Sequence, residues 1–408
     1  MTQSQPNQLS MGRILILGGL LVTLSMGIRH GFGLFNLPIT TANGWGRETF
    51  AFAIALQNLM WGVSQPFTGA LADRFGSFRV MFAGAFLYIF GLIIMATTTS
   101  GFSFTIGAGL LIGLAQSAST YSIVYGLIGR NVSPEKRVWA MGVAAAAGSF
   151  GQFLMIPVEQ GLISELGPND ALLILALLAT FLIPLAIGLK EPKSSNLSQS
   201  NQTISEALKE AFSTRSFQLL TLGYFVCGFQ VVFIGVHLAP YLKDMSATIP
   251  SVGNPQVATI ALALIGLFNV FGTYYAGVLG QRFAKRYLLS TIYVSRSIVI
   301  IGFLLIPLSP ITTYLFAALM GLLWLSTVPL TNGIVAQIFG VKYLSMLSGV
   351  DFFSHQIGSF MGAYLGGYLY DKTGSYNVVW MIAIALGAFA GLVNLPIKEQ
   401  SVLRTQTA

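Results

Sequence analysis

Charged side chains and cysteine are both scarce in this sequence. Only 8% of its 408 residues are Asp, Glu, Lys or Arg and 54% are hydrophobic, whereas about a quarter of an ordinary soluble domain is charged. A water-soluble globule is therefore excluded. The single cysteine, Cys227, excludes an intramolecular disulfide and a multi-cysteine metal site. No combination of nucleophile, base and orienting group is apparent, so we predict no enzyme, no cofactor and no metal.

Long apolar runs dominate the sequence, each with enough residues for a helix to cross roughly 30 Å of hydrocarbon. Twelve such runs leave no room for a separate soluble domain, and they predict an all-α polytopic membrane protein. In the first half they are Ile14 to Thr40, Phe50 to Ala72, Val80 to Thr98, Phe104 to Gly129, Val138 to Ile163 and Ala171 to Leu189. In the second half they are Phe217 to Tyr241, Val257 to Gly280, Leu288 to Leu308, Tyr314 to Ala336, Met346 to Tyr370 and Val378 to Ile397.

Basic residues between these runs fall mostly on one side of the predicted membrane. With both termini in one compartment, only Arg47, Lys243 and Lys372 lie on the opposite side. Cytoplasmic loops carry such an excess of Lys and Arg, so we expect both termini to be cytoplasmic in a multi-pass membrane protein. The net charge of +8 then reflects the topology of the chain and is compatible with contacts to membrane lipids. Nucleic acid is not an expected partner.

Two short sequences recur at nearly the same offset, which indicates duplicated halves. Gly69-Ala-Leu-Ala-Asp-Arg-Phe75 returns as Gly277-Val-Leu-Gly-Gln-Arg-Phe283, and Gly148-Ser-Phe150 returns as Gly358-Ser-Phe360. We predict an N-terminal six-helix bundle over residues 1–189, a cytoplasmic linker with a short interfacial helix over 190–216, and a C-terminal six-helix bundle over 217–408. Secondary transporters use such pairs of bundles around a site near the membrane midplane.

The first copy of that repeat resembles the loop between helices 2 and 3 of the major facilitator superfamily, with Gly69, Asp73, Arg74 and Gly76 in register. Residues 136–152 are similar to the helix 5 signature of its monocarboxylate transporter-like branch, which includes oxalate and formate exchangers. Residues 31–35, 324–331 and 355–367 look like bacterial members of that branch. The resemblance implies the major facilitator fold, and we expect a monomer. It also implies that a small carboxylate is transported by alternating access, either together with a proton or in exchange for another anion. One departure is the eighth run, which contains no charge.

Arg29 is the charged residue near the middle of the first run, on a small polar face that includes Asn36. A charge at the bilayer centre costs about 2.5–3.5 kcal/mol on insertion scales, so residues there are functional candidates. A guanidinium holds a carboxylate through two parallel hydrogen bonds, and Arg29 is therefore predicted to bind an anion. The alternative is an arginine satisfied by carbonyls or by a neighbouring acid. Arg296 is either a second cationic site or the partner of a carboxylate in its own half.

Asp351 and His355 stand one helical turn apart, where they can meet or share a partner. We predict that they carry a coupling proton, with His237 as a further relay group; the alternative is that they fix helix packing. Glu159 is an outer-gate group, a proton-relay group or a satisfied interface residue. Other side chains are expected to set the size and orientation of the substrate: Gln57, Asn58, Tyr121, Gln152, Asn269, Trp324, Asn332 and Phe352.

A gate is predicted at the cytoplasmic surface, from Gly69, Asp73, Arg74, Gly76, Arg130 and Arg137. Asp73 is expected to accept hydrogen bonds from a helix N-terminus or to pair with Arg130 or Arg137. The second copy of the repeat has Gln281 instead, so this latch is asymmetric. Small-residue stripes in the fifth and eleventh runs, Ala140/Ala144/Gly148 and Gly358/Gly362/Gly366, are interpreted as surfaces on which the bundles slide.

Three functions compete on these observations. The first is a secondary transporter of a small organic anion, a monocarboxylate, that is proton-coupled or exchanges anions. The second is a major facilitator exporter of drugs or metabolites, favoured if the charge of Arg29 is neutralised within the protein. The third is a membrane sensor without transport, against which the missing soluble output domain argues.

Overall fold

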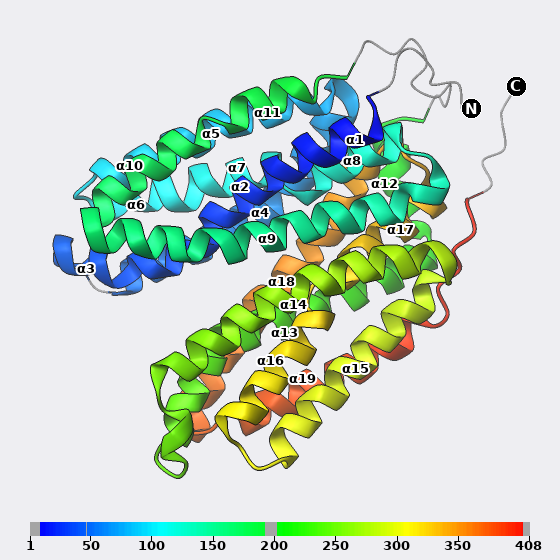
Figure 1. Ribbon diagram of the computed structural model, residues 1–408. Coiled ribbons are helices and arrows are strands. Elements are labelled where there is room, and N and C mark those ends of the chain that lie inside the picture. Colours follow the sequence, from blue (N-terminus) through cyan, green and yellow to red (C-terminus); the bar gives the residue numbers. More distant parts are fainter. Residues whose placement is uncertain (1–8, 46, 192–201, 403–408) are drawn as a thin grey trace, which may run out of the picture.

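The computed structural model describes residues 9–45, 47–191 and 202–402, and all regular structure within them is helical. The helices form two bundles, one from each half of the chain (Figure 1). The first contains α1 (Met11–Arg13), η1 (Ile14–Gly18), α2 (Gly19–His30), η2 (Gly31–Phe35), α3 (Asn36–Asn43), α4 (Arg47–Phe75), α5 (Ser77–Thr97), α6 (Gly101–Phe104), η3 (Thr105–Leu111), α7 (Ile112–Ser119), α8 (Tyr121–Asn131), α9 (Pro134–Leu166), α10 (Pro168–Ala179) and α11 (Leu182–Gly188).

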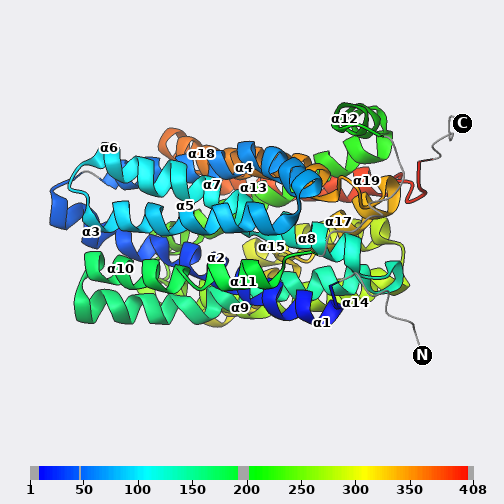
Figure 2. The same ribbon diagram turned by 90° about the horizontal axis from the view of Figure 1, so that it is seen from above.

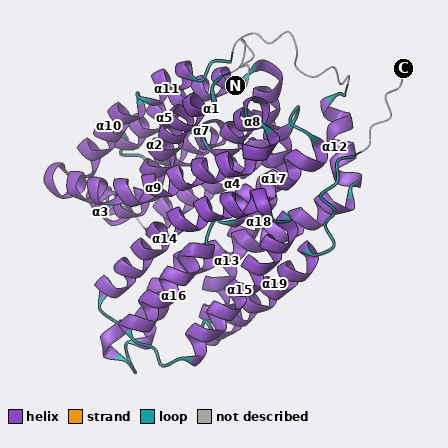
Figure 3. Cartoon of the chain, turned by 45° about the vertical axis from the view of Figure 1, so that its right-hand side comes forward, coloured by secondary structure: helices purple, strands orange, loops and turns teal. Residues whose placement is uncertain are grey.

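A short helix, α12 (Ile204–Ser213), precedes the second bundle. It begins with a capping box in which Thr203 and Glu206 bond each other's backbone N–H groups, and the bond from the Thr203 N–H lowers the pKa of Glu206. The second bundle contains α13 (Arg215–Met245), η4 (Pro250–Val252), α14 (Pro255–Arg282), α15 (Lys285–Leu305), α16 (Pro310–Leu323), α17 (Thr327–Phe339), α18 (Leu344–Thr373) and α19 (Asn377–Asn394). Figure 3 shows α12 at the end of the molecule where the termini lie.

Ten helical stretches of the described chain are long and apolar enough to cross a membrane. The other two crossings are α4 and α18, which have 29 and 30 residues. Both carry buried polar side chains, Gln57 and Gln65 in α4 and Asp351 and His355 in α18. These two helices pack against each other between the bundles, so that part of their polar surface is covered by protein. The prediction of twelve crossings in two six-helix bundles is confirmed.

The bundles approach each other at the end that holds both termini and diverge towards the opposite end (Figure 1). The view from above shows α12 at the same end (Figure 2). The largest contacts between the bundles are made by α4 with α18 and by α9 with α14, and smaller ones by α9 with α17 and α8 with α18. Glycines permit the close approach in the two largest contacts: a Cβ on Gly69 would lie 2.8 Å from the Cα of Met346, and a Cβ on Gly277 would lie 2.9 Å from the Cα of Gly142. The repeated glycines Gly69 and Gly277 thus serve the same purpose in the two halves.

The glycine stripe of α18 faces its own bundle. A Cβ on Gly358 would lie 3.1 Å from the backbone nitrogen of Phe229 in α13, one on Gly362 would lie 3.1 Å from the Cα of the same residue, and Gly366 packs on the ring of His237. The interpretation of this stripe as a sliding surface between the bundles is therefore wrong. The small residues of α18 pack against α13, and a different face of α18 packs against α4.

Four crossings of the described chain are interrupted. The first changes from α-helix to the 3-10 turn η2 at Gly31, the fourth breaks at Thr120, where the backbone is extended, the sixth breaks at Thr180 and Phe181, between α10 and α11, and the tenth breaks between Leu323 and Thr327. Interrupted helices leave backbone groups that neighbouring side chains must satisfy, and in transporters they mark the walls of binding sites.

The close approach of α14 to α9 can be tested with two glycine variants. We expect Gly277→Ala to lower the melting temperature of the purified protein, because overpacking against Gly142 costs about 1–3 kcal/mol. Gly302→Ala in α15 is the matched control, since a Cβ there meets no heavy atom within 4 Å, and alanine favours a helix by about 1 kcal/mol. Equal melting temperatures for the two variants would contradict the packing.

Candidate functional site

Arg29 is the next-to-last residue of α2 and is half-buried. Its guanidinium donates a hydrogen bond to Oδ1 of Asn58 in α4, and its Cζ lies 4.9 Å from the ring centroid of Trp61. Its Nε is buried without a partner. Among the described residues no carboxylate lies within 4.0 Å of this guanidinium. Its positive charge is therefore held by an amide and an aromatic ring, and no acid of the described chain neutralises it.

Asn58 is oriented towards Arg29 by its own helix. Its Nδ2 donates to the carbonyl oxygen of Ile54 at 3.0 Å, which leaves Oδ1 for the guanidinium. The backbone oxygen of Asn58 accepts a hydrogen bond of 3.3 Å from Nε2 of Gln356 in α18. The residue that positions Arg29 is thus also a contact between the two bundles.

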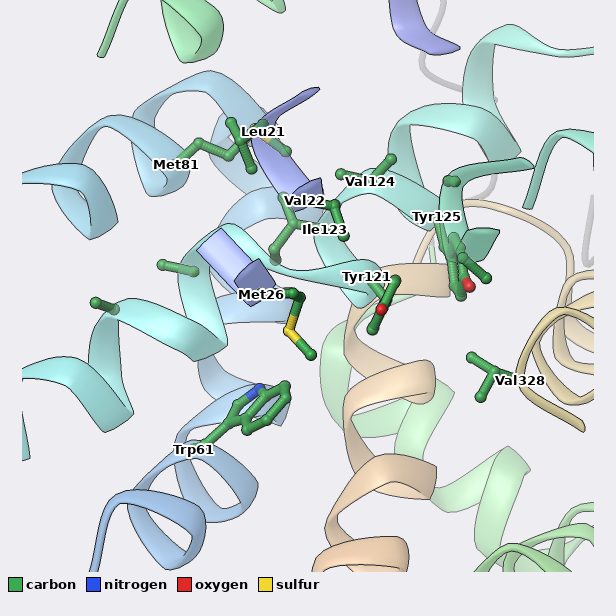
Figure 4. Packing of buried hydrophobic residues seen from close by; sticks show 14 of the residues in the cluster. Leu21, Val22, Met26, Trp61, Met81, Tyr121, Ile123, Val124, Tyr125 and Val328 are labelled. Carbon is green, nitrogen blue, oxygen red and sulfur yellow. The ribbon is translucent and has the colours of Figure 1, made fainter. Parts of the chain in front are cut away.

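Aromatic rings continue from Arg29 into the second bundle. The Trp61 ring packs on Phe352 of α18 with centroids 4.8 Å apart, and Phe352 stacks on His355 at 5.4 Å with 10° between the ring planes. The Trp61 indole N–H is fixed by Gln65 at 2.9 Å. Figure 4 shows Trp61 pointing towards Met26 of α2. Sequence reasoning missed Trp61, although its position three residues after Asn58 places it on the same face of α4.

Tyr121 is the first residue after the break in the fourth crossing. It interacts electrostatically with Arg29, and its hydroxyl packs against Gly148 of α9. Gln152 of α9 is half-buried and faces the second bundle, since a Cβ on Gly266 would lie 3.9 Å from its Cδ. The structure therefore places Arg29, Asn58 and Tyr121 together, with Gln152 on the adjoining bundle surface.

Other predicted site residues are used in packing. Gln57 is 1% exposed and donates to the carbonyl of Ala108 at 2.8 Å. Asn269 donates to Oγ of Ser149 at 2.9 Å and accepts from the N–H of Leu325 at 3.0 Å, so its amide joins the bundles. Asn332 donates to the carbonyl one turn before it. The side chain of Asn36 lies outside the described ones.

Arg296 has a different environment from Arg29. It is fully buried in α15, and all three of its side-chain nitrogens donate to protein groups: Nε and Nη2 to the carbonyl of Leu323, Nη2 also to the carbonyl of Trp324, and Nη1 to Gln230 at 3.4 Å. These carbonyls end α16, where a positive charge is favourable. The guanidinium of Arg296 therefore caps the break in the tenth crossing. This geometry differs from that expected of a second anion site, and no described carboxylate pairs with Arg296.

Asp351 is 1% exposed, and neither of its carboxylate oxygens has a hydrogen bond of good geometry; the hydroxyl of Thr221 is the group best placed to give one. His355 forms no ion pair with Asp351 within 4.0 Å. Its Nδ1 lies 3.4 Å from Oγ of Ser359, and its Nε2 is buried without a partner. His237 is bonded to the carbonyl of Ala363 at 2.9 Å and lies apart from this pair.

A latch joins the bundles at the end that holds the termini. Asp73, at the end of α4, accepts 2.8 Å from Nη1 of Arg130 through Oδ1 and 2.9 Å from the N–H of Met346 through Oδ2. Met346 lies in the first turn of α18, where N–H groups lack helical partners and attract negative charge. Asp73 therefore makes both contacts that the sequence analysis considered.

Arg130 has further partners besides Asp73, and the side chains of Arg74 and Arg137 make other contacts. Arg130 also donates to Ser77 at 2.7 Å and to Glu191 at 3.1 Å. Gly76 has a φ of 90°, which favours glycine at the turn into α5. Arg74 lies over the ring of Phe75, and Arg137 donates to the carbonyl of Val132 and not to Asp73. Gln281, the counterpart of Asp73 in the second repeat, is exposed.

A membrane protein of two six-helix bundles, with an uncompensated cation near their contact and a latch at one end, belongs to the class of secondary transporters by its architecture. The sequence model of the Major Facilitator Superfamily matches residues 15–350 and 251–405. The chain therefore belongs to the Major Facilitator Superfamily, whose members are transporters and not enzymes.

Relatives and solved structures agree with this assignment. The chain is 25% identical over 385 residues to the uncharacterised MFS-type transporter YcxA of Bacillus subtilis, covering 90% of each protein. It is 24% identical over 388 residues to monocarboxylate transporter 13 of Bos taurus, covering 91% of this chain and 86% of that one. The E. coli fucose:proton symporter FucP has the same fold, with a TM-score of 0.71 at 15% identity over 93% of this chain and 97% of that one.

The latch can be tested by weakening its charge. We expect Asp73→Asn to open the terminus side about tenfold more often, because a hydrogen bond to a charged group contributes about 1.5–3 kcal/mol. The readout is maleimide labelling of Ser348→Cys, a buried position one turn into α18, in a Cys227→Ser background. Gln281→Asn, at the exposed counterpart, is the control. Equal labelling rates in the Asp73 and Gln281 variants would contradict a latch.

Proposed function

We propose that this transporter moves a small organic anion, a monocarboxylate, by alternating access, coupled to a proton or in exchange for another anion. The observation that carries the proposal is the guanidinium of Arg29, which Asn58 and Trp61 hold and no described acid neutralises. A carboxylate supplies the missing charge and two parallel acceptors. Monocarboxylate transporter 13 among the relatives supports this substrate class.

The charge available at the site favours one carboxylate over two. Arg296, the other arginine near the middle of a crossing in the described chain, is engaged on all three side-chain nitrogens by protein groups. A dicarboxylate would therefore bring a second negative charge into the bundle contact without a free cation to meet it, which is costly in a medium of low dielectric constant. Trp61, Phe352 and Tyr121 surround the site with rings that suit a short apolar tail.

We further propose that both termini face the cytoplasm, as the distribution of basic residues favours. The end of the molecule closed by Asp73 is then the cytoplasmic end, and the described conformation is one in which substrate reaches Arg29 from outside. The return half of the cycle requires that the bond from the Met346 N–H to Asp73 breaks and that α4 separates from α18. We expect a monomer in the bacterial inner membrane to suffice for this cycle.

Counterflow in proteoliposomes tests the substrate class. We expect a panel of short monocarboxylates to exchange, and Arg29→Lys to weaken their binding at least tenfold, because lysine keeps the charge but loses the bidentate fork. Arg74→Lys, at an exposed position near the latch, is the matched control. Exchange of lipophilic cations without exchange of any carboxylate would overturn the proposal, and unchanged affinity in Arg29→Lys would remove Arg29 from the site.

Asp351 is proposed as a coupling group because its carboxylate is buried without a good hydrogen bond. We expect Asp351→Asn to retain counterflow and to lose accumulation driven by a pH gradient, since an amide cannot exchange a proton. Asp170→Asn, at an exposed position at the start of α10, should leave both activities intact. Accumulation that survives Asp351→Asn at the level of the control would refute this role.

A further inference from the structure

Glu159 in α9 is a buried acid, and it takes part in none of the contacts described above. Its side chain is 0% exposed, and both carboxylate oxygens lack a hydrogen-bond partner. No described Lys, Arg or His lies within 4.0 Å of it. An ionised carboxylate in such surroundings is strongly disfavoured, because it has lost water without gaining a counterion or a donor.

The carboxylate of Glu159 lies against the first crossing where that helix changes its winding. A Cβ on Gly31 would overlap the carboxylate, so glycine at this position makes room for it. Gly31 opens the 3-10 turn η2 and follows directly after the end of α2, which carries Arg29 and His30. Any movement of η2 therefore changes the surroundings of Glu159 and the position of Arg29 together.

The titratable groups around Glu159 do not neutralise it. Tyr88 of α5 interacts with it electrostatically. From α2, Arg29 forms no ion pair with it within 4.0 Å, and His30 is bonded to the carbonyl of Met26 at 2.7 Å. The other elements that pack on α9 contribute the following groups: Tyr121, Tyr125 and Arg130 from α8, Asp170 from α10, and Tyr274, Tyr275 and Arg282 from α14. None of these gives Glu159 a hydrogen bond or an ion pair.

The ligand that suits this acid is a proton and not a metal ion. Calcium takes six to eight oxygen ligands and magnesium takes six, whereas the described residues offer no group of three or more His, Cys, Asp or Glu that could hold a metal. We propose that Glu159 is a proton-binding site, protonated in the described conformation, and that the 3-10 turn Gly31–Phe35 links its protonation to the position of Arg29. The consequence of this link for transport rests on the proposed function.

The link follows from the packing. A neutral Glu159 fits the closely packed contact between α9 and η2, in which it has no exposed surface and no hydrogen-bond partner, whereas a charged one gains free energy only if η2 moves and admits water or a donor. Loss of the proton therefore favours a different arrangement of the first crossing just after Arg29. A transporter can use such a dependence to connect proton release with a change in anion binding.

Infrared difference spectroscopy tests the bound proton without any substrate. At neutral pH the spectrum of the full chain minus that of Glu159→Gln should contain the carbonyl band of a protonated carboxyl, shifted in D₂O. Glu165→Gln, at an exposed position on the same helix, should not remove this band. Glu159→Asp keeps a carboxyl and should move the band without abolishing it. A difference spectrum that shows only ionised carboxylate would overturn the proposal.

Transport measurements test the link to Arg29. We expect Glu159→Gln to keep carboxylate counterflow within twofold of the wild type, while accumulation driven by a pH gradient falls to the level reached without a gradient. Accumulation equal to that of Glu165→Gln would refute the link. If the wild type moves no carboxylate while the protonated-carboxyl band of Glu159 is present, the proposed function fails and the proton site stands.

Discussion

A charge inside a membrane protein must be met by a partner, and the two arginines near the middle of crossings in the described chain meet that constraint in different ways. Arg296 gives its hydrogen bonds to the carbonyls that end α16 and to Gln230, so its charge stabilises a broken helix. Arg29 has an amide, an aromatic ring and a buried Nε without an acceptor. The same residue type is thus a structural cap in one bundle and an incomplete site in the other. The uncompensated guanidinium is the feature on which the proposal of an anionic substrate rests.

The two halves each place a Glu–base ion pair at the terminus side, but they differ in the residue that supplies the base and in the presence of Asp73. Glu191 and Glu399 are 208 residues apart, the offset of the Gly69 repeat, and each pairs with a base at the terminus side. The base is Arg130 after the fourth crossing in the first half, whereas it is Lys285 before the ninth in the second. Only the first copy adds Asp73, which reaches the N-terminal turn of α18. The hydrogen bond from Met346 that joins the bundles at this end is therefore accepted by an acid of the first bundle and donated by a backbone N–H of the second.

Much of the fold can be predicted from the sequence because the length of an apolar run depends only on consecutive residues. The polar crossings α4 and α18 were also found, since runs that are interrupted by single polar residues still leave enough apolar surface for a span. The direction in which α18 turns its glycines, and the breaks at Thr120 and Trp324, depend on neighbouring helices and were not predicted. The spacing of Asp351 and His355 placed them one turn apart, but Asp351 lies beside Thr221, and His355 stacks on Phe352 and faces Ser359. The two side chains form no ion pair within 4.0 Å. Trp61 was missed because an aromatic residue in an apolar run is indistinguishable from lipid-facing ones until its neighbour is known.

The contact between a substrate carboxylate and Arg29 is the claim on which the functional account depends. Its most direct measurement is a crystal structure of the protein with a short bromine-substituted monocarboxylate, located by anomalous diffraction. The account predicts a bromine peak beside the Trp61 and Phe352 rings, with the carboxylate on the guanidinium of Arg29. A peak elsewhere in the protein, with Arg29 still bonded only to Asn58, would contradict it.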